Sequence, residues 1–447
     1  MYRAEVPAYG ALVQIVKQVD SDVLTGEGKS SNALPLRHQL ERHGAIRLGT
    51  DQELRDVTRL FAVMGMYPVG YYDLRVAGIP LHATAFRPVR EDSLVRNPFR
   101  VFTSVLRKSS VPEETRKLAE AALVKRSLFS ERLLELVTVA ERGEPMTGRS
   151  AEDLIAEALK IFKWHSRSTV ALNDYLRLKK EHPMIADIVC FPSAHINHLT
   201  PRTLDIELVQ KRMVEQGLPA KERIEGPPVR NCPILLRQTS FQALEEQVQF
   251  LGIDGAFLQG THTARFGEVE QRGAALTRRG RALYDQLLQQ AILENETDPV
   301  RTGKGFDLIL KEAFSKFPDS WEELRSEGLV YFRYQVTPKG ISMESLLDPT
   351  AHKRQARITQ LLSRGSIECA PITYEDFLPL SAAGIFKSNL GDEPVRLLTE
   401  LNENGLRELE GALGRRILDP FELYEELEQD SIRECREMLC LDDILLY

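Results

Sequence analysis

The chain has 447 residues, of which 43% are hydrophobic, 28% charged and 7% aromatic. This apolar content excludes a mainly disordered chain, and the length suffices to bury a core without disulfides or a structural metal. Its 58 Lys and Arg against 65 Asp and Glu give a net charge of −7, which argues against nucleic acid as a partner. A small acidic substrate stays compatible, because a basic pocket can lie inside a mildly acidic protein.

Targeting signals and cysteine usage predict the compartment. The N-terminal segment lacks the apolar run of a secretory signal, and no window reaches 18 uninterrupted apolar residues. The five cysteines are scattered and form no CxxC pair, which is typical of reduced thiols. We therefore expect a cytoplasmic globular protein.

The first part of the chain combines helices and strands. Apolar residues recur at helical spacing over 8–20 and 51–66. From about residue 67 the pattern is extended, and it continues after a turn at Gly78 as the apolar run 79–86. Pro88 ends or bends that strand.

Later segments continue this mixture. Helical patterning covers about 112–182, with a break near 143–145, and a second helical region begins at about 390. The segments between them that we expect to be strands are 186–199, 230–241, 264–270 and 329–336.

This order predicts an α+β fold. Because there is no internal repeat or linker, we expect one elaborated domain over 1–447. Its sheet core is expected at about 67–105 and 186–390, with a helical N-terminal segment before it. A helical insertion is expected at about 110–185, and a helical C-terminal segment at 391–447.

Common catalytic signatures are absent from the sequence. The segment Gly26–Ser31 resembles the end of a phosphate loop, but Val23 stands where that loop needs a glycine. There is no GxGxxG after a strand, no GxSxG and no HExxH. The chemistry therefore has to be sought among individual side chains.

Most of the nine histidines lie in polar, exposed or helical surroundings, where a structural role is the simplest interpretation; these are His38, His43, His165, His182 and His352. His82 differs, because it interrupts an apolar strand and must be hydrogen-bonded or ligated there. His195 and His198 end another extended segment and point to opposite faces of a regular strand.

Glu268 and Glu270 share one face of the predicted strand 264–270. A solvated strand face is the simple interpretation of this pair. Two strand histidines and one strand glutamate are also the parts of a facial triad, which leaves positions open on Fe(II) for a chelating substrate and dioxygen. Nine histidines allow many such combinations, so spacing alone does not select one.

Long blocks of the sequence resemble the bacterial 2-oxoadipate dioxygenase/decarboxylase family, also called hydroxyglutarate synthase. They are ERHGAIRLGT (41–50), FAVMGMYPVGYYDL (61–74), PLHATAFRPV (80–89), INHLTPRTLDI (196–206), PILLRQTSFQALEE (233–246), RFGEVEQRGAALTRRGRALYD (265–285) and YEDFLPLSAAGIFKSNLG (374–391). The resemblance implies a core like that of the vicinal oxygen chelate superfamily, in which an incomplete β-barrel or curved mixed sheet surrounds one metal.

The resemblance also implies site residues. The metal ligands it implies are His82, His198 and Glu268, with His198 preferred to His195 and Glu268 preferred to Glu270. The metal is expected to be one Fe(II) per chain, although another divalent ion can occupy such a site.

The substrate-binding and catalytic residues implied by the resemblance are Arg87, which would bind a substrate carboxylate, and Ser381. Leu380 stands beside Ser381 in the segment that closes over the substrate, where the family commonly has a smaller valine. Arginine suits a buried carboxylate through its bidentate geometry, and Arg272 and Arg237 are alternatives to Arg87.

The implied reaction converts 2-oxoadipate and O2 to 2-hydroxyglutarate and CO2, a step of lysine catabolism. Two other readings stay open: an oxygen-independent isomerase or lyase of the same superfamily, and a non-catalytic regulatory protein that kept the fold. We expect no nucleic-acid or membrane partner, and oligomeric state is not predicted.

Overall fold

The computed structural model describes residues 1–30, 33–252, 256–297, 305–340, 355–378 and 403–445. Contacts within the chain group it into two compact units that alternate along the sequence. The first comprises Met1–Glu225, Arg237–Gln271 and Asp376–Leu418; the second comprises Gly226–Leu236, Arg272–Glu375 and Asp419–Tyr447. That both belong to one elaborated domain stays a prediction.

Nine strands of the described residues form one mixed sheet with the order β2-β3-β4-β1-β6-β9-β8-β5, and β7 pairs with β9 outside this path. β1 is parallel to β4 and antiparallel to β6, and β6 is parallel to β9. The predicted α+β class with a mixed sheet is confirmed, and the sheet is not closed into a barrel. Its strands are β1 (Arg42–Leu48), β2 (Met66–Asp73), β3 (Leu81–Pro88), β4 (Phe99–Leu106), β5 (Arg167–Ala171), β6 (His198–Pro201), β7 (Leu236–Ser240), β8 (Leu244–Leu251) and β9 (Phe257–Arg272).

β1 lies between β4 and β6 and is therefore part of the sheet core, although the predicted core begins only at about 67. The prediction missed it because this segment carries His43 and two arginines, Arg42 and Arg47, which is typical of an exposed segment. In the structure its side chains from His43 onward are buried.

One face of the sheet is covered by α4 (Asp51–Val63). Thr50 caps this helix by accepting from the Glu53 backbone N–H at 3.1 Å, while the Glu53 carboxylate accepts from the Thr50 N–H. Leu54 and Phe61 of α4 belong to the same buried cluster as Phe86 of β3. Burial of this apolar stripe fixes which residues of β3 face the helices.

The predicted N-terminal helix is α2 (Pro7–Gly26), which begins with a proline in its first turn. Leu12 and Val16 of α2 pack with Phe241, which directly follows β7, and with Val269 of β9. The other short helical elements of the first unit are α1 (Tyr2–Glu5), α3 (Leu36–Leu40), η1 (Leu74–Ala77), α5 (Glu91–Arg96), η2 (Lys108–Ser110) and α11 (Ile206–Glu215).

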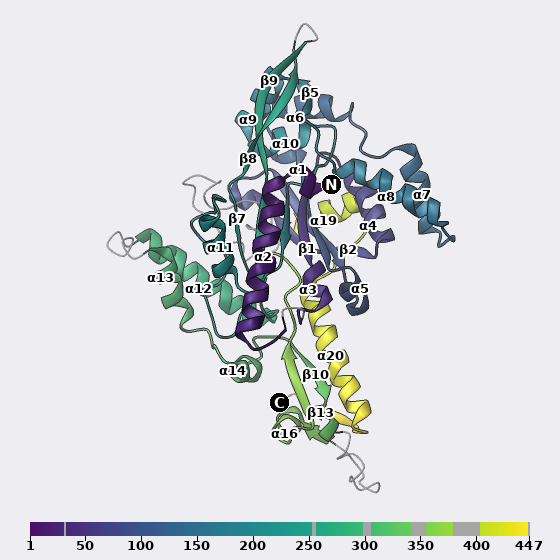
Figure 1. Cartoon of the computed structure of the whole chain (residues 1–447). Coiled ribbons are helices and arrows are strands. Elements are labelled where there is room, and N and C mark those ends of the chain that lie inside the picture. The colour runs from purple at the N-terminus through teal and green to yellow at the C-terminus, as the bar shows by residue number, and fades with distance from the viewer. Residues whose placement is uncertain (31–32, 253–255, 298–304, 341–354, 379–402, 446–447) are drawn as a thin grey trace. The chain divides into compact units, whose positions relative to one another are not determined.

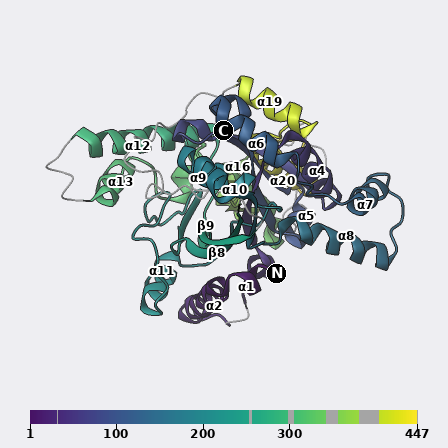
Figure 2. The same ribbon diagram turned by 90° about the horizontal axis from the view of Figure 1, so that it is seen from above.

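The predicted helical insertion contains α6 (Glu113–Leu123), α7 (Glu131–Glu141), α8 (Gly148–Phe162) and α9 (Leu172–Glu181). Helices α7 and α8 lie side by side in both views (Figures 1 and 2). The insertion is not wholly helical, because β5 pairs in parallel with β8.

The expected strand over 186–199 is wrong in its first half. Residues Pro183–Val189 form α10, with proline in the first turn and His182 accepting from the Met184 N–H at 3.1 Å. These caps select a helix for an apolar run that fits either structure.

The second unit holds two small sheets, β10–β12 and β11–β13. The predicted strand 329–336 is confirmed as β10. Residues 391–402 of the predicted C-terminal helical segment lie outside the described residues. The elements not yet given are α12 (Arg278–Thr297), α13 (Phe306–Phe314), α14 (Trp321–Ser326), β10 (Phe332–Val336), β11 (Gln355–Arg357), α16 (Ile358–Ser363), β12 (Ile367–Pro371), α19 (Glu403–Leu413), α20 (Pro420–Met438) and β13 (Asp443–Leu445).

Candidate metal centre

Three neighbouring strands bring polar side chains to one face of the large sheet. In the register of β1 and β6, Ala45 is opposite His198 and His43 is opposite Thr200. In the register of β6 and β9, His198 is opposite Phe266, and the two rings stack with centroids 5.0 Å apart. Residues directly opposite one another share a face, so this face carries the imidazoles of both β1 and β6.

His43, His198 and Glu268 form a buried cluster on this face, in which one potential ligand atom from each lies within 4.8 Å of the others. Oε2 of Glu268 is 3.2 Å from Nε2 of His43 and 3.4 Å from Nε2 of His198. All three side chains are inaccessible to solvent. Two imidazoles and a carboxylate are the donor set of a facial triad for a divalent transition metal.

The hydrogen bonding of this cluster fits a metal ion. Within the described residues, both ring nitrogens of His198 and Oε1 of Glu268 are buried without a hydrogen-bond partner. Buried polar atoms are normally satisfied, so atoms that converge without partners are suited to bind a cation. The cluster is a candidate metal site.

Burial and neighbouring charges set the protonation of the two imidazoles. Burial lowers the pKa of His198 to about 4, against a smaller opposing effect of Glu268. This imidazole is therefore neutral at pH 7, as a metal ligand must be. Burial also lowers the pKa of His43, but the Glu270 and Glu268 carboxylates outweigh it and the net shift is upward.

Glu270 and Glu268 occupy different positions relative to the imidazoles. Oε2 of Glu270 lies 2.8 Å from Nδ1 of His43, on the opposite side of that ring from Glu268. A carboxylate behind a ligating histidine fixes its tautomer and orientation. The structure therefore brings Glu268 to the imidazoles of His43 and His198 and places Glu270 behind that of His43.

His82 does not lie in the cluster, so the predicted set needs a correction. Its side chain shares a face of β3 with that of Phe86, the face that packs against α4. Burial, followed by the charge of Arg107, lowers the pKa of His82 to about 4. His43 of β1 takes the place in the cluster that was expected for His82.

Arg87 points to the opposite face of β3 from His82, the face that carries the cluster. It is buried and donates through Nε to Asp376 at 2.7 Å. Phe377, the next residue, lies with its ring edge-on to His43, with centroids 5.0 Å apart. Arg87 thus anchors the segment that packs against a cluster histidine.

The other predicted substrate residues lie elsewhere. Arg237 pairs with Glu207 of α11. Arg272 belongs to the second unit, where it donates to the Tyr374 carbonyl at 2.8 Å. Leu380 and Ser381 are outside the described residues, so their roles stay predictions.

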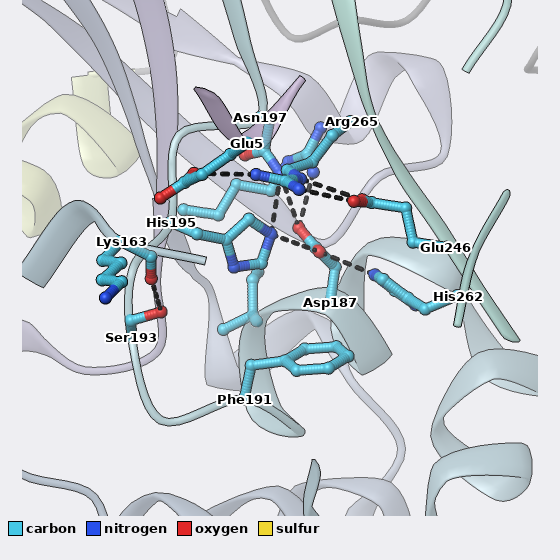
Figure 3. A network of polar contacts seen from close by, with 12 residues as sticks. Glu5, Lys163, Asp187, Phe191, Ser193, His195, Asn197, Glu246, His262 and Arg265 are labelled. Carbon is cyan, nitrogen blue, oxygen red and sulfur yellow. Dashed lines mark hydrogen bonds and ion pairs between the residues drawn. The ribbon is translucent and has the colours of Figure 1, made fainter. Parts of the chain in front are cut away.

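His195 belongs to a buried network centred on Asp187 of α10 (Figure 3). One oxygen of Asp187 is 3.1 Å from Nε2 of His195 and 2.9 Å from Nε2 of His262. The other oxygen accepts from Arg47 at 2.6 Å and from Asn197 at 3.0 Å. Burial raises the pKa of Asp187, but His195 and Arg47 outweigh it and hold that pKa well below its usual range.

This network positions Arg47 beside the cluster. Arg47 lies on the same face of β1 as His43, and its charge contributes to lowering the pKa of His198. Sequence reasoning missed His43 and Arg47 because their surroundings in 41–50 look polar. The two residues are four positions apart, so in a strand they lie on the same face, and this spacing could have identified them as a pair.

No helix among the described residues is both long and apolar enough to cross a bilayer. The cytoplasmic location stays a prediction.

Comparisons with known proteins find relatives over nearly the whole chain. Residues 1–389 match the family 2-oxoadipate dioxygenase/decarboxylase. A 2-oxoadipate dioxygenase/decarboxylase of Escherichia coli is 49% identical, covering 97% of this chain and 95% of the relative. One of Pseudomonas putida is 45% identical, covering 99% and 95%.

Solved structures agree with this similarity. The crystal structure of hydroxyglutarate synthase from Pseudomonas putida in complex with 2-oxoadipate superposes with a TM-score of 0.86 at 42% identity. The match covers 99% of this chain and 96% of that chain.

Proposed function

This chain belongs to the 2-oxoadipate dioxygenase/decarboxylase family, and from that premise we propose that it converts 2-oxoadipate and O2 to 2-hydroxyglutarate and CO2 with Fe(II) as cofactor. The observation that supports this most is the buried cluster of His43, His198 and Glu268. A protein that kept only the fold would not need to keep three converging ligand groups.

In this proposal His43, His198 and Glu268 hold the metal. When bound, Fe(II) supplies Lewis acidity and open positions for a chelating 2-oxo acid and dioxygen. Thr200 donates to Oε2 of Glu268 at 3.2 Å and orients the carboxylate. Oε2 of Glu270, 2.8 Å from Nδ1 of His43, orients that imidazole.

Substrate binding requires cationic partners, because a buried unpaired carboxylate is costly. We infer that Arg47 binds one substrate carboxylate, since it lies beside the cluster and the Asp187 carboxylate holds its guanidinium in place. Arg87, which points to the same face, stays a second candidate. Both are arginines, whose planar guanidinium suits a carboxylate.

The test is an oxygen-electrode assay of the iron-loaded protein with 2-oxoadipate. We expect O2 consumption, CO2 release and loss of 2-oxoadipate in equal amounts. Activity that continues without O2 would instead support an isomerase or lyase. No turnover of 2-oxoadipate with iron confirmed in the protein would refute the proposed substrate.

A further inference from the structure

Strand β7 runs beside β9, which carries Glu268, and the backbone sets their register. The Phe241 N–H donates to the Gly267 carbonyl at 3.1 Å, and the Gly273 N–H donates to the Leu235 carbonyl at 2.7 Å. These bonds flank β7, and they step in opposite directions along the two segments. β7 therefore runs antiparallel to β9, as does β8, which follows β7 in the chain.

This register places Ser240 directly opposite Glu268 and Gln238 directly opposite Glu270. Opposite residues of an antiparallel pair share a face and have Cβ atoms about 4.5–5.5 Å apart. Gln238 and Ser240 therefore point to the face of the sheet that carries the metal cluster. Arg237, the residue before Gln238, agrees with this alternation, because it pairs with Glu207 of α11 on the other face.

Both side chains are fully buried, and their polar atoms have no partner among the residues that the structure describes. Gln238 and Ser240 are each 0% exposed. Within the described residues, neither the amide oxygen and nitrogen of Gln238 nor the hydroxyl of Ser240 has a partner. The Gln238 backbone is satisfied, since it exchanges two hydrogen bonds with Glu225 at 2.8 and 3.0 Å. Only the side chain therefore needs a partner.

A buried amide without a hydrogen-bond partner destabilises a folded protein. When such an amide faces a functional site, a bound ligand that supplies the missing partner explains it. The amide N–H groups of Gln238 and the hydroxyl of Ser240 are donors. They match the carboxylate and keto oxygens of an oxo acid.

We propose that Gln238, assisted by Ser240, is a substrate-positioning residue that hydrogen-bonds oxygen atoms of the oxo acid on the β7 side of the metal cluster. This inference rests on the proposed function. Arg47 on β1 and Gln238 on β7 then approach the cluster from strands on either side of β6 and β9.

The experiment compares full-length, iron-loaded wild type with Gln238→Met, which keeps the length of the side chain but removes both polar atoms. We expect kcat/KM for 2-oxoadipate to fall about 10- to 100-fold, chiefly through KM, as for loss of a hydrogen bond to a charged group. Iron affinity should stay within twofold of wild type, and the thermal midpoint should not fall, because a buried unsatisfied amide has been removed.

Thr239→Val is the matched control. Thr239 lies between the two residues on β7 and is equally buried, but it points to the opposite face. Its hydroxyl also has no hydrogen-bond partner in the part of the chain that the structure describes. Its kcat/KM should equal that of wild type. Ser240→Ala is a smaller change and should lower kcat/KM about fivefold. It tests the proposal if Gln238→Met does not fold.

Wild-type kcat/KM in both Gln238→Met and Ser240→Ala would overturn this inference and leave the proposed function standing. An equal loss in Thr239→Val, or a loss explained by lower iron occupancy, would also overturn it. If the iron-loaded wild type does not turn over 2-oxoadipate, the proposed function fails, and this inference fails with it.

Discussion

Replacing Asp187 by alanine removes the carboxylate at the centre of the buried network. Asp187 is 3% exposed and Arg47 is 8% exposed, and their atoms are 2.6 Å apart. The substitution leaves the Arg47 guanidinium without its buried counter-charge, which costs about 3–5 kcal/mol. His195 and His262 lose an acceptor as well. We therefore expect the free energy of unfolding to fall by at least about 3 kcal/mol at pH 7.

Urea denaturation followed by tryptophan fluorescence measures this loss directly, because the Trp164 ring contacts His195 with centroids 4.6 Å apart. The folded-state pKa of Asp187 is depressed. Its contribution is therefore present above the unfolded pKa, near about 3.9, and is lost as pH falls through the folded value. The difference from wild type should be constant from pH 6 to 8 and should shrink in acid.

Asp22→Ala is the control, because Asp22 is an exposed carboxylate that pairs with Arg212. It should change the free energy of unfolding by less than about 1 kcal/mol. A loss below about 1 kcal/mol for Asp187→Ala would refute the interpretation of Asp187 as the counter-charge of Arg47.

Three further predictions concern carboxylates that are buried or partly buried. Glu270→Gln should weaken iron binding about 10- to 100-fold by releasing His43, and a chelator-competition Kd within twofold of wild type would contradict this. Single replacement of Arg87 or Asp376 by an uncharged residue should each lower the free energy of unfolding by about 3–5 kcal/mol, whereas the double variant should lose less than their sum; strict additivity in a double-mutant cycle would argue against the pair. Burial raises the pKa of Glu428 from 4.5 to about 7, so the folded state keeps its proton longer than the unfolded state and stability falls from pH 4.5 to 7. Glu428→Gln should therefore be more stable than wild type by about 2 kcal/mol at pH 8 and equal to it at pH 4, as thermal unfolding at both pH values would show.

The alternation within β3 was predictable from the sequence, but the face that carries the site was not. The five-residue step from His82 to Arg87 predicts that the two side chains lie on opposite faces, and in the structure they do. All eight residues of β3 are buried, however, so local hydropathy does not distinguish the two faces. The choice depends on where α4 packs, which is a long-range property.

The burial of His43 was not predictable from the local sequence either. In 41–50 its neighbours are charged, and this favours an exposed segment in any local analysis. Their partners come from far along the chain, since Asp187 pairs with Arg47 and Glu268 with His43. Glu268 and His198 were predictable because the family resemblance identified their blocks, whereas Gln238 and Ser240 needed the register of β7 and β9.

Iron(II) titration of the metal-free protein shows which side chains hold the metal. The cluster of His43, His198 and Glu268 predicts one Fe(II) per chain for wild type and for the control variant His82→Ala. His43→Ala and His198→Ala should both lose binding and, with it, oxygen consumption on 2-oxoadipate. Full binding by His43→Ala together with loss of binding by His82→Ala would contradict the account.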